Sequence, residues 1–490
     1  MKTAIILVYL GTVVSIGLFG RRFFKGTGED YFVASRTIGS FVLLMTLFGT
    51  HMTAFSLLGA SGEAYRRGLG VFSLMASSSA LVAPAVFFFV GVRLWRLARR
   101  NGYLTQAQFF EDRWQADGLG LLLFLFLVAL LVPYLLIGVL GGGLTFAQLT
   151  EGAVPQWLGS LIICGVILLY VTAGGNRSTA WVNTFQTLVF MSLGAVTFTL
   201  IVRDAGGLAA GLRAVDPALL LHGDRIRPLE LVSYTLIPLS AAMFPHLFMH
   251  WLSARGPQTF RLPIVAYPLC VAAVWVPSVV AGVLGAHEFP GLEGPAANSI
   301  LLKMIDSHAP AIVAGLLAAG VLAAVMSSID SQVLSLSAMF TENVVGRLNP
   351  EAIGGRGEVV WGRGFVVAIL AVTYGLSLVV ESSLFKLGVW SFTGFAALFP
   401  LVIAALYWRR STRAGAYASL VAVIVLWAGF LWAYWGRSAI SVGGSGLMPV
   451  AVIFAVAAVV MVVVSLLTEA PAAEVVERFF PGVREEREAA

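Results

Sequence analysis

Apolar stretches long enough to cross a membrane recur along the whole chain, and short polar connections separate them. The hydrocarbon core of a bilayer is about 30 Å thick, so a helix needs about 20 apolar residues to span it. The alternating ten-residue pattern of outer-membrane β-barrels does not occur. The pattern therefore predicts an all-α polytopic membrane protein, built as a single transmembrane domain over residues 1–490. Thirteen helices are predicted, over residues 4–20, 38–62, 70–92, 118–149, 155–174, 180–202, 231–253, 262–284, 309–342, 364–384, 387–408, 414–435 and 447–468.

The composition supports a membrane protein and argues against several other classes. Of the 490 residues, 59% are hydrophobic and 11% are charged, against about 25% charged residues in soluble domains. Cys164 and Cys270 lie in separate apolar segments, so we expect buried side chains and no disulfide framework. No phosphate-binding loop of an ATP-driven pump is present. The lipid bilayer is the expected surrounding, and neither nucleic acid nor an organic cofactor is expected as a partner.

Basic residues indicate which connections face the cytoplasm. The first predicted helix lacks a small-x-small cleavage site and is followed by Arg21, Arg22 and Lys25, which favours an uncleaved helix over a signal peptide. With the N-terminus outside, most of the 31 Lys and Arg residues fall on the cytoplasmic side, as the positive-inside rule requires. The C-terminus is then cytoplasmic. The cytoplasmic segments are residues 21–37, 93–117, 175–179, 254–261, 343–363, 409–413 and the tail from 469.

Three predicted helices carry polar residues, glycine or proline where a membrane helix is normally most apolar. The stretches are "LFGTHMTAFSLLGASG" in the second helix, "LIPLSAAMFPHLFMHW" in the seventh and "VMSSIDSQ" in the ninth. Breaks at membrane depth are tolerated where they line a cavity or pack against protein. Because the second and seventh helices stand five apart, we expect two inverted repeats, each opened by a broken helix. The repeats cover residues 37–202 and 231–408, with extra segments at residues 1–36 and 409–490.

The ninth predicted helix places a carboxylate among hydroxyls. Ser327, Asp330 and Ser331 lie at i, i+3 and i+4 and therefore share one face. An aspartate near the centre of a membrane helix costs roughly 2.5–3.5 kcal/mol on insertion, so it normally faces the protein interior with a partner. Serines alone are commonly packing and hydrogen-bonding residues in such helices. The added aspartate favours a site for a hard cation such as sodium, which prefers oxygen ligands.

Six stretches together make the chain recognisable as similar to a known family. They are "EDYFVASRTIG", "SLLGASGEAYRRGLG", "LTQAQFFEDRW", "YVTAGGNRSTAWVNTFQ", "FPHLF" and "LAAVMSSIDSQVLSLSAMFTENVV". The sequence resembles the sodium:solute symporter family, which includes the proline and pantothenate permeases and the sodium–galactose and sialic-acid symporters. The resemblance implies a LeuT-like core of two inverted five-helix repeats in helices 2–11, with helices 1, 12 and 13 added. It also implies a bacterial inner-membrane transporter, expected to act as a monomer, that imports a small organic solute with Na+ as coupling ion.

The family's main sodium site uses backbone carbonyls on the broken second helix, and a carbonyl with two hydroxyls on the ninth. The resemblance assigns these ligands to Gly49, Met52, Ala324, Ser327 and Ser328. Carbonyl ligands tolerate any side chain, and both hydroxyls are present. All five positions therefore suit a sodium site.

Two positions depart from the family pattern. His51 stands where the proline permease type has an aspartate, and Asn183 stands where many members have an aspartate in the sixth helix. In members with a second sodium site, that aspartate meets the helix-nine positions of Asp330 and Ser331. We hypothesise that Asp330 and Asn183 face each other with acid and amide exchanged, forming a second cation site with Ser331. Pantothenate-like members already have "DSQ" on this helix, however, so Asp330 need not compensate for Asn183.

Family positions also point to residues that contact the solute. These are His51, Thr53, Ser56, Met75, Ser78, Ala241 and Phe244. Phe244 is a candidate lid over the bound solute. Met75 stands where the galactose symporter has an acidic sugar contact, and the fourth helix lacks the arginine that sialic-acid members use. A carboxylate would then be met by the N-termini of broken helices, and the solute is not identified.

Several alternatives remain open at this point. Protons could be coupled through Asp330 or His51, whose pKa values burial could move toward neutrality. A solute-sensing receptor of the same fold is a further alternative, although no output domain supports it. An enzyme is not expected, because no nucleophile, base and orienting group occur together. His246 and His250 have a zinc-binding spacing but no third ligand, so structural hydrogen bonding is the favoured role.

Overall fold

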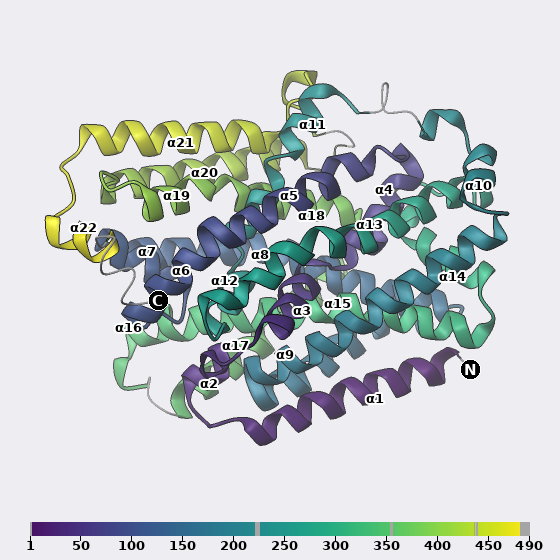
Figure 1. Ribbon diagram of the computed structural model, residues 1–490, viewed down its shortest axis with the longest axis horizontal. Coiled ribbons are helices and arrows are strands. Elements are labelled where there is room, and N and C mark those ends of the chain that lie inside the picture. Colours follow the sequence, from purple (N-terminus) through teal and green to yellow (C-terminus); the bar gives the residue numbers. More distant parts are fainter. Residues whose placement is uncertain (1, 221–225, 353–355, 436, 438–439, 481–490) are drawn as a thin grey trace.

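A computed structural model describes residues 2–220, 226–352, 356–435, 437 and 440–480. The long helices run mostly side by side along the longest axis of the molecule (Figure 1). Within the described ranges there is no β-strand, and one isolated parallel bridge joins Ile38 to Ala254. The predicted all-α class is therefore confirmed.

The helices follow one another with few long connections. Their bounds are α1 (Lys2–Gly20), α2 (Gly28–Val33), α3 (Ser40–His51), α4 (Ala60–Arg67), α5 (Ser77–Val86), α6 (Val92–Asn101), α7 (Gln106–Trp114), α8 (Asp117–Leu149), α9 (Gln156–Asp204), α10 (Leu208–Ala214), α11 (Pro228–Tyr234), α12 (Pro245–Ser253), α13 (Arg261–Glu288), α14 (Ile300–His308), α15 (Ala311–Met339), α16 (Gly346–Leu348), α17 (Arg356–Ser377), α18 (Leu384–Ala397), α19 (Phe399–Tyr407), α20 (Arg413–Tyr434), α21 (Pro449–Leu467) and α22 (Ala473–Phe479). Short π-helical segments join several of them, at Phe55–Gly59, Phe72–Ala76, Phe87–Gly91 and Phe340–Val345. A 3-10 segment, Ile237–Ala242, continues α11.

The number of membrane spans differs from the prediction. Ten helices in the described part of the chain are long and apolar enough to cross a membrane, or up to twelve if each of two bent pairs is one span. The predicted count of thirteen is therefore not confirmed. The 49 residues of α9 contain two of the predicted spans. The chain changes direction within α9 at Gly175, whose φ of 58° is readily adopted only by glycine.

Two helical spans are broken near their middle. α3 and the following segment Phe55–Arg67 are bent by 54°, and the segment Pro228–Ala242 and α12 are bent by 47°. These are the second and seventh predicted helices, so the breaks predicted there are confirmed. At each break, helix ends with backbone groups that lack intrahelical partners meet in the protein interior.

The third polar stretch, in the ninth predicted helix, does not break its helix. α15 is continuous across it. The hydroxyl of Ser328 donates to the Val325 carbonyl (3.0 Å) and that of Ser335 donates to the Gln332 carbonyl (2.9 Å). Because these serines bond to carbonyls of their own helix, the polar side chains need no unwound backbone. The residues of this stretch are therefore held on a rigid element.

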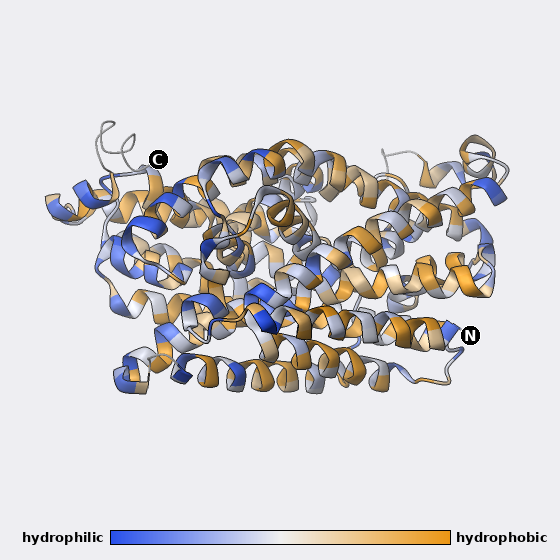
Figure 2. Ribbon diagram, turned by 60° about the horizontal axis from the view of Figure 1, so that its bottom comes forward, coloured by the Kyte–Doolittle hydropathy of each residue, from blue (hydrophilic) through white to orange (hydrophobic). Residues whose placement is uncertain are grey.

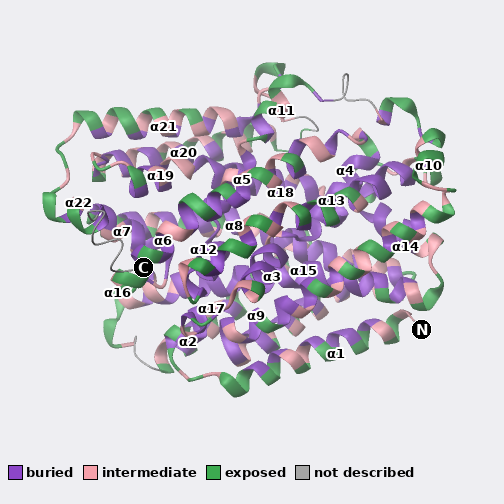
Figure 3. Cartoon of the chain, viewed as in Figure 1, coloured by how far each residue is buried: buried purple, intermediate pink, exposed green. Residues whose placement is uncertain are grey.

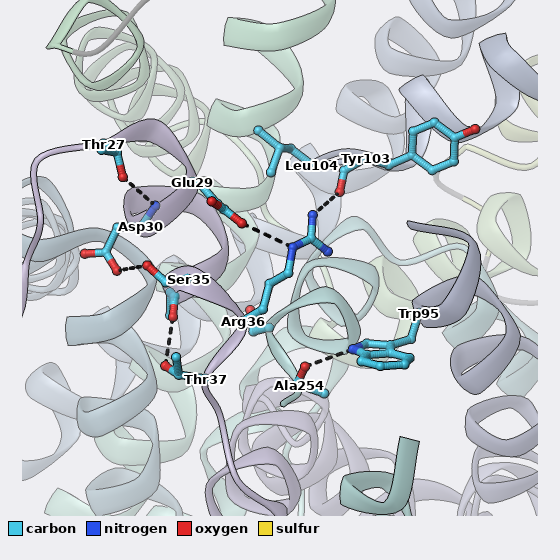
Figure 4. A network of polar contacts seen from close by, with 12 residues as sticks. Thr27, Glu29, Asp30, Ser35, Arg36, Thr37, Trp95, Tyr103, Leu104 and Ala254 are labelled. Atoms are coloured by element: carbon cyan, nitrogen blue, oxygen red, sulfur yellow. Dashed lines mark hydrogen bonds and ion pairs between the residues drawn. The ribbon is translucent and has the colours of Figure 1, made fainter. Parts of the chain in front are cut away.

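The segments predicted to be cytoplasmic lie together at one end of the bundle. Arg36 donates to the Tyr103 carbonyl (2.9 Å; Figure 4), and Arg113 donates to the Ser411 hydroxyl (2.9 Å). At the opposite end, Lys2 pairs with Asp306. The N-terminus and α22 accordingly lie at opposite ends of the molecule (Figure 1). Further bonds at the first end are Arg177–Asp30, Trp95–Ala254, Arg347–Glu111 and Arg478–Asp112.

Burial is greatest along α15, around which the other helices pack. Every residue from Leu317 to Met339 is buried, whereas α1 and α21 are largely exposed on their outer sides (Figure 3). Hydrophobic residues run along the lengths of the helices, and hydrophilic ones gather mainly toward the two ends of the bundle (Figure 2). Such a surface suits contact with lipid, because apolar side chains cover the middle of the molecule.

Candidate cation and solute site

The broken helix α3 meets α15 at Ser327. The Ser327 Oγ lies 3.0 Å from the Gly49 carbonyl oxygen and 3.1 Å from the Ala324 carbonyl oxygen. A hydroxyl has one proton, so Ser327 donates to one of these carbonyls at a time. Glycine is required at position 49, because a Cβ there would lie 2.1 Å from the Thr187 Oγ1 of α9. Three of the five residues assigned to the main sodium site therefore converge on one point.

The other two residues assigned to this site are close in sequence but are not bonded to that point. Met52 follows α3 in extended conformation (φ −90°, ψ 97°), so its carbonyl has left the helix. The Ser328 hydroxyl is occupied by the Val325 carbonyl of its own helix. No side-chain hydrogen bond among the described residues joins Met52 or Ser328 to Gly49, Ala324 or Ser327.

Asp330 and Asn183 face each other, as hypothesised. The Asn183 Nδ2 lies 3.3 Å from Asp330 Oδ1 and 2.9 Å from the Ser331 hydroxyl, which itself donates to Asp330 Oδ1 (3.0 Å). The Tyr170 hydroxyl donates to the other oxygen, Asp330 Oδ2 (2.8 Å). Asp330 is fully buried, and no cationic side chain in the described part of the chain pairs with it. Its hydrogen-bond partners are all uncharged.

Thr50 connects these two groups of oxygen atoms. Its Oγ1 lies 3.3 Å from the Ser327 carbonyl and 3.2 Å from the Ser331 hydroxyl. It also lies 3.4 Å from Asn183 Nδ2 and 3.4 Å from His250 Nε2, and His250 Nε2 is 3.1 Å from the Ser331 hydroxyl. One proton and two lone pairs cannot satisfy four neighbours together. Thr50 can therefore bond to only some of these neighbours at one time.

Sequence reasoning did not select Thr50, Tyr170 or His250 for this site. Thr50 stands beside Gly49 at the end of a broken helix, which is a usable signal. Tyr170 and His250 carry no local signal, since only the packing of α9 and α12 against α15 brings them to Asp330. The predicted structural role of His250 agrees with its bond to Ser331. His246 has no hydrogen-bond partner among the described residues, and these contain no cluster of three metal-binding side chains.

The residues assigned to the solute lie around the two breaks. The rings of His51 and Phe244 are 5.7 Å apart and nearly perpendicular (77°), so the breaks of the two broken helices are in contact. His51 Nδ1 is bonded to the Tyr267 hydroxyl. Thr53 Oγ1 accepts from the Phe55 N–H (3.0 Å) and therefore orders the restart of the helix.

The remaining solute positions have local partners. The Ser56 hydroxyl donates to the Thr53 carbonyl (2.9 Å) and the Ser78 hydroxyl donates to the Met75 carbonyl (3.2 Å). α5, which begins at residue 77, packs against the 3-10 segment that carries Ala241. The predicted solute positions therefore lie at the two helix breaks or on elements next to them.

Phe244 lies in the middle of an aromatic cage. Its ring is 4.8 Å from that of Phe395, 5.6 Å from that of Phe392 and 5.5 Å from that of Tyr134. The Phe244 side chain is fully buried. A groove of about 700 Å³ lies elsewhere, between α1, α9 and α15, and none of the predicted solute residues lines it. Phe244 thus packs where the two helix breaks meet.

Comparison with known proteins identifies a group of transporters. The profile of the "Sodium:solute symporter family" matches residues 31–422. The sodium/pantothenate symporter of Escherichia coli (strain K12) is 29% identical over 446 residues, which cover 86% of this chain and 89% of that protein. The sodium/proline symporter of the same strain is 26% identical over 497 residues, which cover 96% and 94% of the two chains.

Solved structures show a shared fold. A Na+-coupled sialic acid symporter, in a substrate-bound outward-open state, superposes with a TM-score of 0.79 at 15% identity and covers 96% of this chain and 98% of that one. A nucleobase-cation-symport-1 family transporter in a closed conformation superposes with a TM-score of 0.58 at 13% identity, over 92% and 97% of the two chains. These neighbours confirm the predicted LeuT-like fold.

Proposed function

Because this chain belongs to the sodium:solute symporter family, we propose that it imports a small organic solute by sodium-coupled symport with alternating access. The observation that carries the proposal is the junction of the broken helix α3 with α15. There carbonyl and hydroxyl oxygens gather beside a buried carboxylate, Asp330, that has only uncharged partners. Oxygen ligands of this kind suit a hard cation. Relatives named as sodium symporters support sodium as that ion.

The proposed main sodium site joins α3 to α15. Its ligands are the carbonyls of Gly49, Met52 and Ala324 and the hydroxyls of Ser327 and Ser328. A cation would compete with the Ser327 proton for the Gly49 carbonyl, so the ion replaces that hydrogen bond as the link between the helices. Sodium then favours one arrangement of the broken helix, and in that arrangement the adjacent residues form the complete solute site. Coupling of this kind is a difference in affinity between two states.

The proposed second cation site contains Asp330, Asn183 and Ser331. A cation bound there would add to the driving force for uptake, because one charge crossing a membrane is worth about 2.3 kcal/mol per 100 mV. This supports roughly fifty-fold accumulation of solute from the membrane potential alone. One sodium ion therefore suffices for uptake. A second ion would square the accumulation ratio of the solute that the sodium gradient can support.

The proposed solute site lies at the two breaks, with His51, Thr53 and Ser56 on one and Ala241 and Phe244 on the other. Met75 and Ser78 form its side wall. Phe244 acts as a lid, which moves aside when solute enters and covers it before the bundle opens to the opposite side. All of these groups come from one chain, so we propose a functional monomer.

The proposed setting is the bacterial inner membrane, with the N-terminus outside and the C-terminus in the cytoplasm. The grouping of the basic connections at one end of the bundle supports this orientation, because positively charged connections are retained in the cytoplasm. The opposite end carries the start of α1, with Lys2 paired to Asp306.

Proton coupling is the second candidate, and one observation favours it. Asp330 is buried among uncharged donors, so a proton would neutralise it as well as a metal ion does. Uptake into proteoliposomes under separate sodium and pH gradients distinguishes the two. Uptake that follows the pH gradient and ignores sodium would replace sodium by protons in the proposal.

The test of the main sodium site uses two serines of α15 with the same local bonding. Ser328→Ala removes a proposed ligand, whereas Ser335→Ala removes a hydroxyl that donates to its own helix in the same way. We expect Ser328→Ala to weaken the sodium dependence of uptake several-fold and to leave the melting temperature without sodium close to that of Ser335→Ala. Uptake by Ser328→Ala that remains fully sodium-driven would remove Ser328 from the site.

A further inference from the structure

Two buried polar side chains beside the solute site have no hydrogen-bond partner. Both ring nitrogens of His246 and the hydroxyl of Tyr134 are enclosed, and none of them meets a donor or acceptor among the described residues. His246 is fully buried, and Tyr134 is 1% exposed. Buried polar groups normally have partners, because an unpaired one loses its hydration without a replacement. These three atoms therefore indicate a place where a ligand supplies the missing bonds.

The two side chains face Phe244. The His246 ring stacks on the Phe244 ring at 5.0 Å and 20°, and the Tyr134 ring lies 5.5 Å from Phe244 and 5.8 Å from His246. A phenyl ring offers neither a proton nor a lone pair. Phe244 thus covers two neighbouring polar side chains whose hydrogen bonds it cannot satisfy. Moving this ring aside would uncover both of them together.

The same point is the N-terminus of α12. This nine-residue helix begins at Pro245, with Phe244 as the residue before it and His246 as its second residue. The His246 side chain stacks on Phe244, so it leans toward the start of the helix, as helical side chains do. The first N–H groups of a helix lack intrahelical acceptors, and the helix dipole favours negative charge there. Backbone and side-chain donors therefore gather at one spot.

We propose that the N-terminus of α12, His246 and Tyr134 form a subsite for the carboxylate of the transported solute, uncovered when the Phe244 ring moves aside. The carboxylate accepts from the Tyr134 hydroxyl, from an N–H of the His246 ring and from the helix N-terminus. The apolar part of the solute packs against Phe392 and Phe395, which already contact Phe244. This inference rests on the proposed symport function and names the class of solute as a monocarboxylate.

The charge of this solute bears on the number of ions. One sodium ion and one carboxylate carry no net charge, so the membrane potential would not drive their joint entry. A second cation at Asp330 makes the transport step move one positive charge. For an anionic solute, coupling to the membrane potential therefore needs the second cation site, and transport of the solute then generates a current.

The experiment compares acids with their amides, using the purified full-length protein in sodium chloride and in potassium chloride. Propionate and benzoate are tested against propionamide and benzamide by the shift in melting temperature, since a ligand that binds the folded state raises it. We expect the two acids to raise the melting temperature in sodium chloride. The amides should need about tenfold higher concentrations for the same shift. Equal shifts for acids and amides would overturn the carboxylate subsite.

Two variants test the named residues. His246→Phe keeps the ring stack on Phe244 but removes both nitrogens, and Tyr134→Phe removes only the hydroxyl. Each is expected to weaken acid binding about tenfold and to keep the shift caused by sodium alone. Tyr65→Phe is the matched control, because its hydroxyl bonds the Phe289 carbonyl (2.7 Å) far from Phe244. Acid binding of wild-type strength in both site variants would overturn the assignment.

Failure of this inference differs from failure of the proposed function. A wild-type protein that responds to sodium but to neither acid refutes the carboxylate subsite and leaves symport intact. A wild-type protein that does not respond to sodium refutes the proposed sodium coupling. If a variant does not fold, the comparison of acids with amides on the wild-type protein still decides the solute class.

Discussion

Two aspartates are completely buried in the described part of the chain, and their surroundings differ. Asp30 lies on α2 among the polar connections at one end of the bundle. Its carboxylate bonds to the Arg177 guanidinium (2.7 Å), the Ser35 hydroxyl (2.7 Å) and the Lys25 N–H (2.8 Å) (Figure 4 shows the Ser35 bond). Burial alone would raise the pKa of Asp30, but these three donors together hold that pKa below its usual value. Asp30 is thus a charge that the protein itself neutralises.

Asp330 has no such neutralising group among the described residues. Its partners Tyr170, Asn183 and Ser331 are uncharged. Hydrogen bonds reduce the cost of a buried carboxylate, but they do not remove it as a paired cation does. A buried acid that pairs with a cationic side chain of the protein has a structural role, whereas a buried acid without such a partner can bind a cation from solution.

The largest effect is expected for Asp30→Asn, measured as stability. The substitution leaves the Arg177 guanidinium at a largely buried position without its counter-charge, which costs about 3 kcal/mol of unfolding free energy. Denaturant unfolding in detergent measures this loss. Glu29→Gln is the control, because the Glu29 side chain is 56% exposed and its pair with Arg36 is worth less than about 1 kcal/mol. Unchanged stability of Asp30→Asn would end the comparison.

Asp330→Asn should show the reverse pattern. An amide suits the uncharged partners of Asp330, so stability is kept, but the charge that attracts a cation is lost. We expect about a tenfold loss of sodium affinity, equal to about 1.4 kcal/mol, and one fewer ion transported per cycle. Sodium titration of uptake and reversal potentials measure the two quantities. Wild-type affinity together with the wild-type ion number would exclude Asp330 from ion binding.

Thr50→Val tests whether the two proposed ion sites communicate. The variant keeps the shape of Thr50 and removes the hydroxyl that lies between Ser327 and Ser331. Loss of one hydrogen bond of about 1 kcal/mol corresponds to about a fivefold weaker sodium response with lower cooperativity. Thr46→Val is the control, since its hydroxyl donates only to carbonyls of α3 itself. Equal sodium curves for both variants would show that the sites act independently.

The smallest effect concerns pH and lies outside the membrane-spanning helices. Burial raises the pKa of Glu111 on α7 from 4.5 to about 7, although Arg347 at 2.7 Å and Asn343 oppose the rise and nearby Asp117 adds to it. Between these pH values the native state keeps a proton that the unfolded chain releases, so stability falls as pH rises from 4.5 to 7. Melting temperatures across this range measure the decline. Glu111→Gln should flatten it, and an equally steep decline in that variant would assign the effect elsewhere.

Several contacts around α15 could be predicted from the sequence. The spacing of Ser327, Asp330 and Ser331 predicted a shared face on a buried helix, and α15 has it. The resemblance placed Asn183 opposite Asp330, and the contact is present at 3.3 Å. The ion and solute ligands assigned from the family remain predictions, although Gly49, Ala324 and Ser327 do meet.

Other parts of the site lay beyond sequence reasoning. Tyr170 stands in an ordinary apolar stretch, and the spacing of His246 and His250 does not show which neighbours their side chains reach. The polar stretch of α15 suggested an irregular helix, but two of its serine hydroxyls bond to carbonyls of the same helix, and the helix is continuous. The sequence predicted separate spans over residues 155–174 and 180–202, whereas the structure joins them in α9, which turns at Gly175.

By itself, the sequence determined that the chain is a helical membrane protein with two broken helices and a costly buried acid. These properties follow from length, apolar composition and local backbone preference, which act over a few neighbouring residues. The packing of the helices determines that, among the described residues, Asp30 pairs with a cation and Asp330 does not. It also places Phe244 against the unpartnered groups of His246 and Tyr134. Such outcomes depend on which helix faces meet across the bundle, and that packing joins residues far apart in the chain.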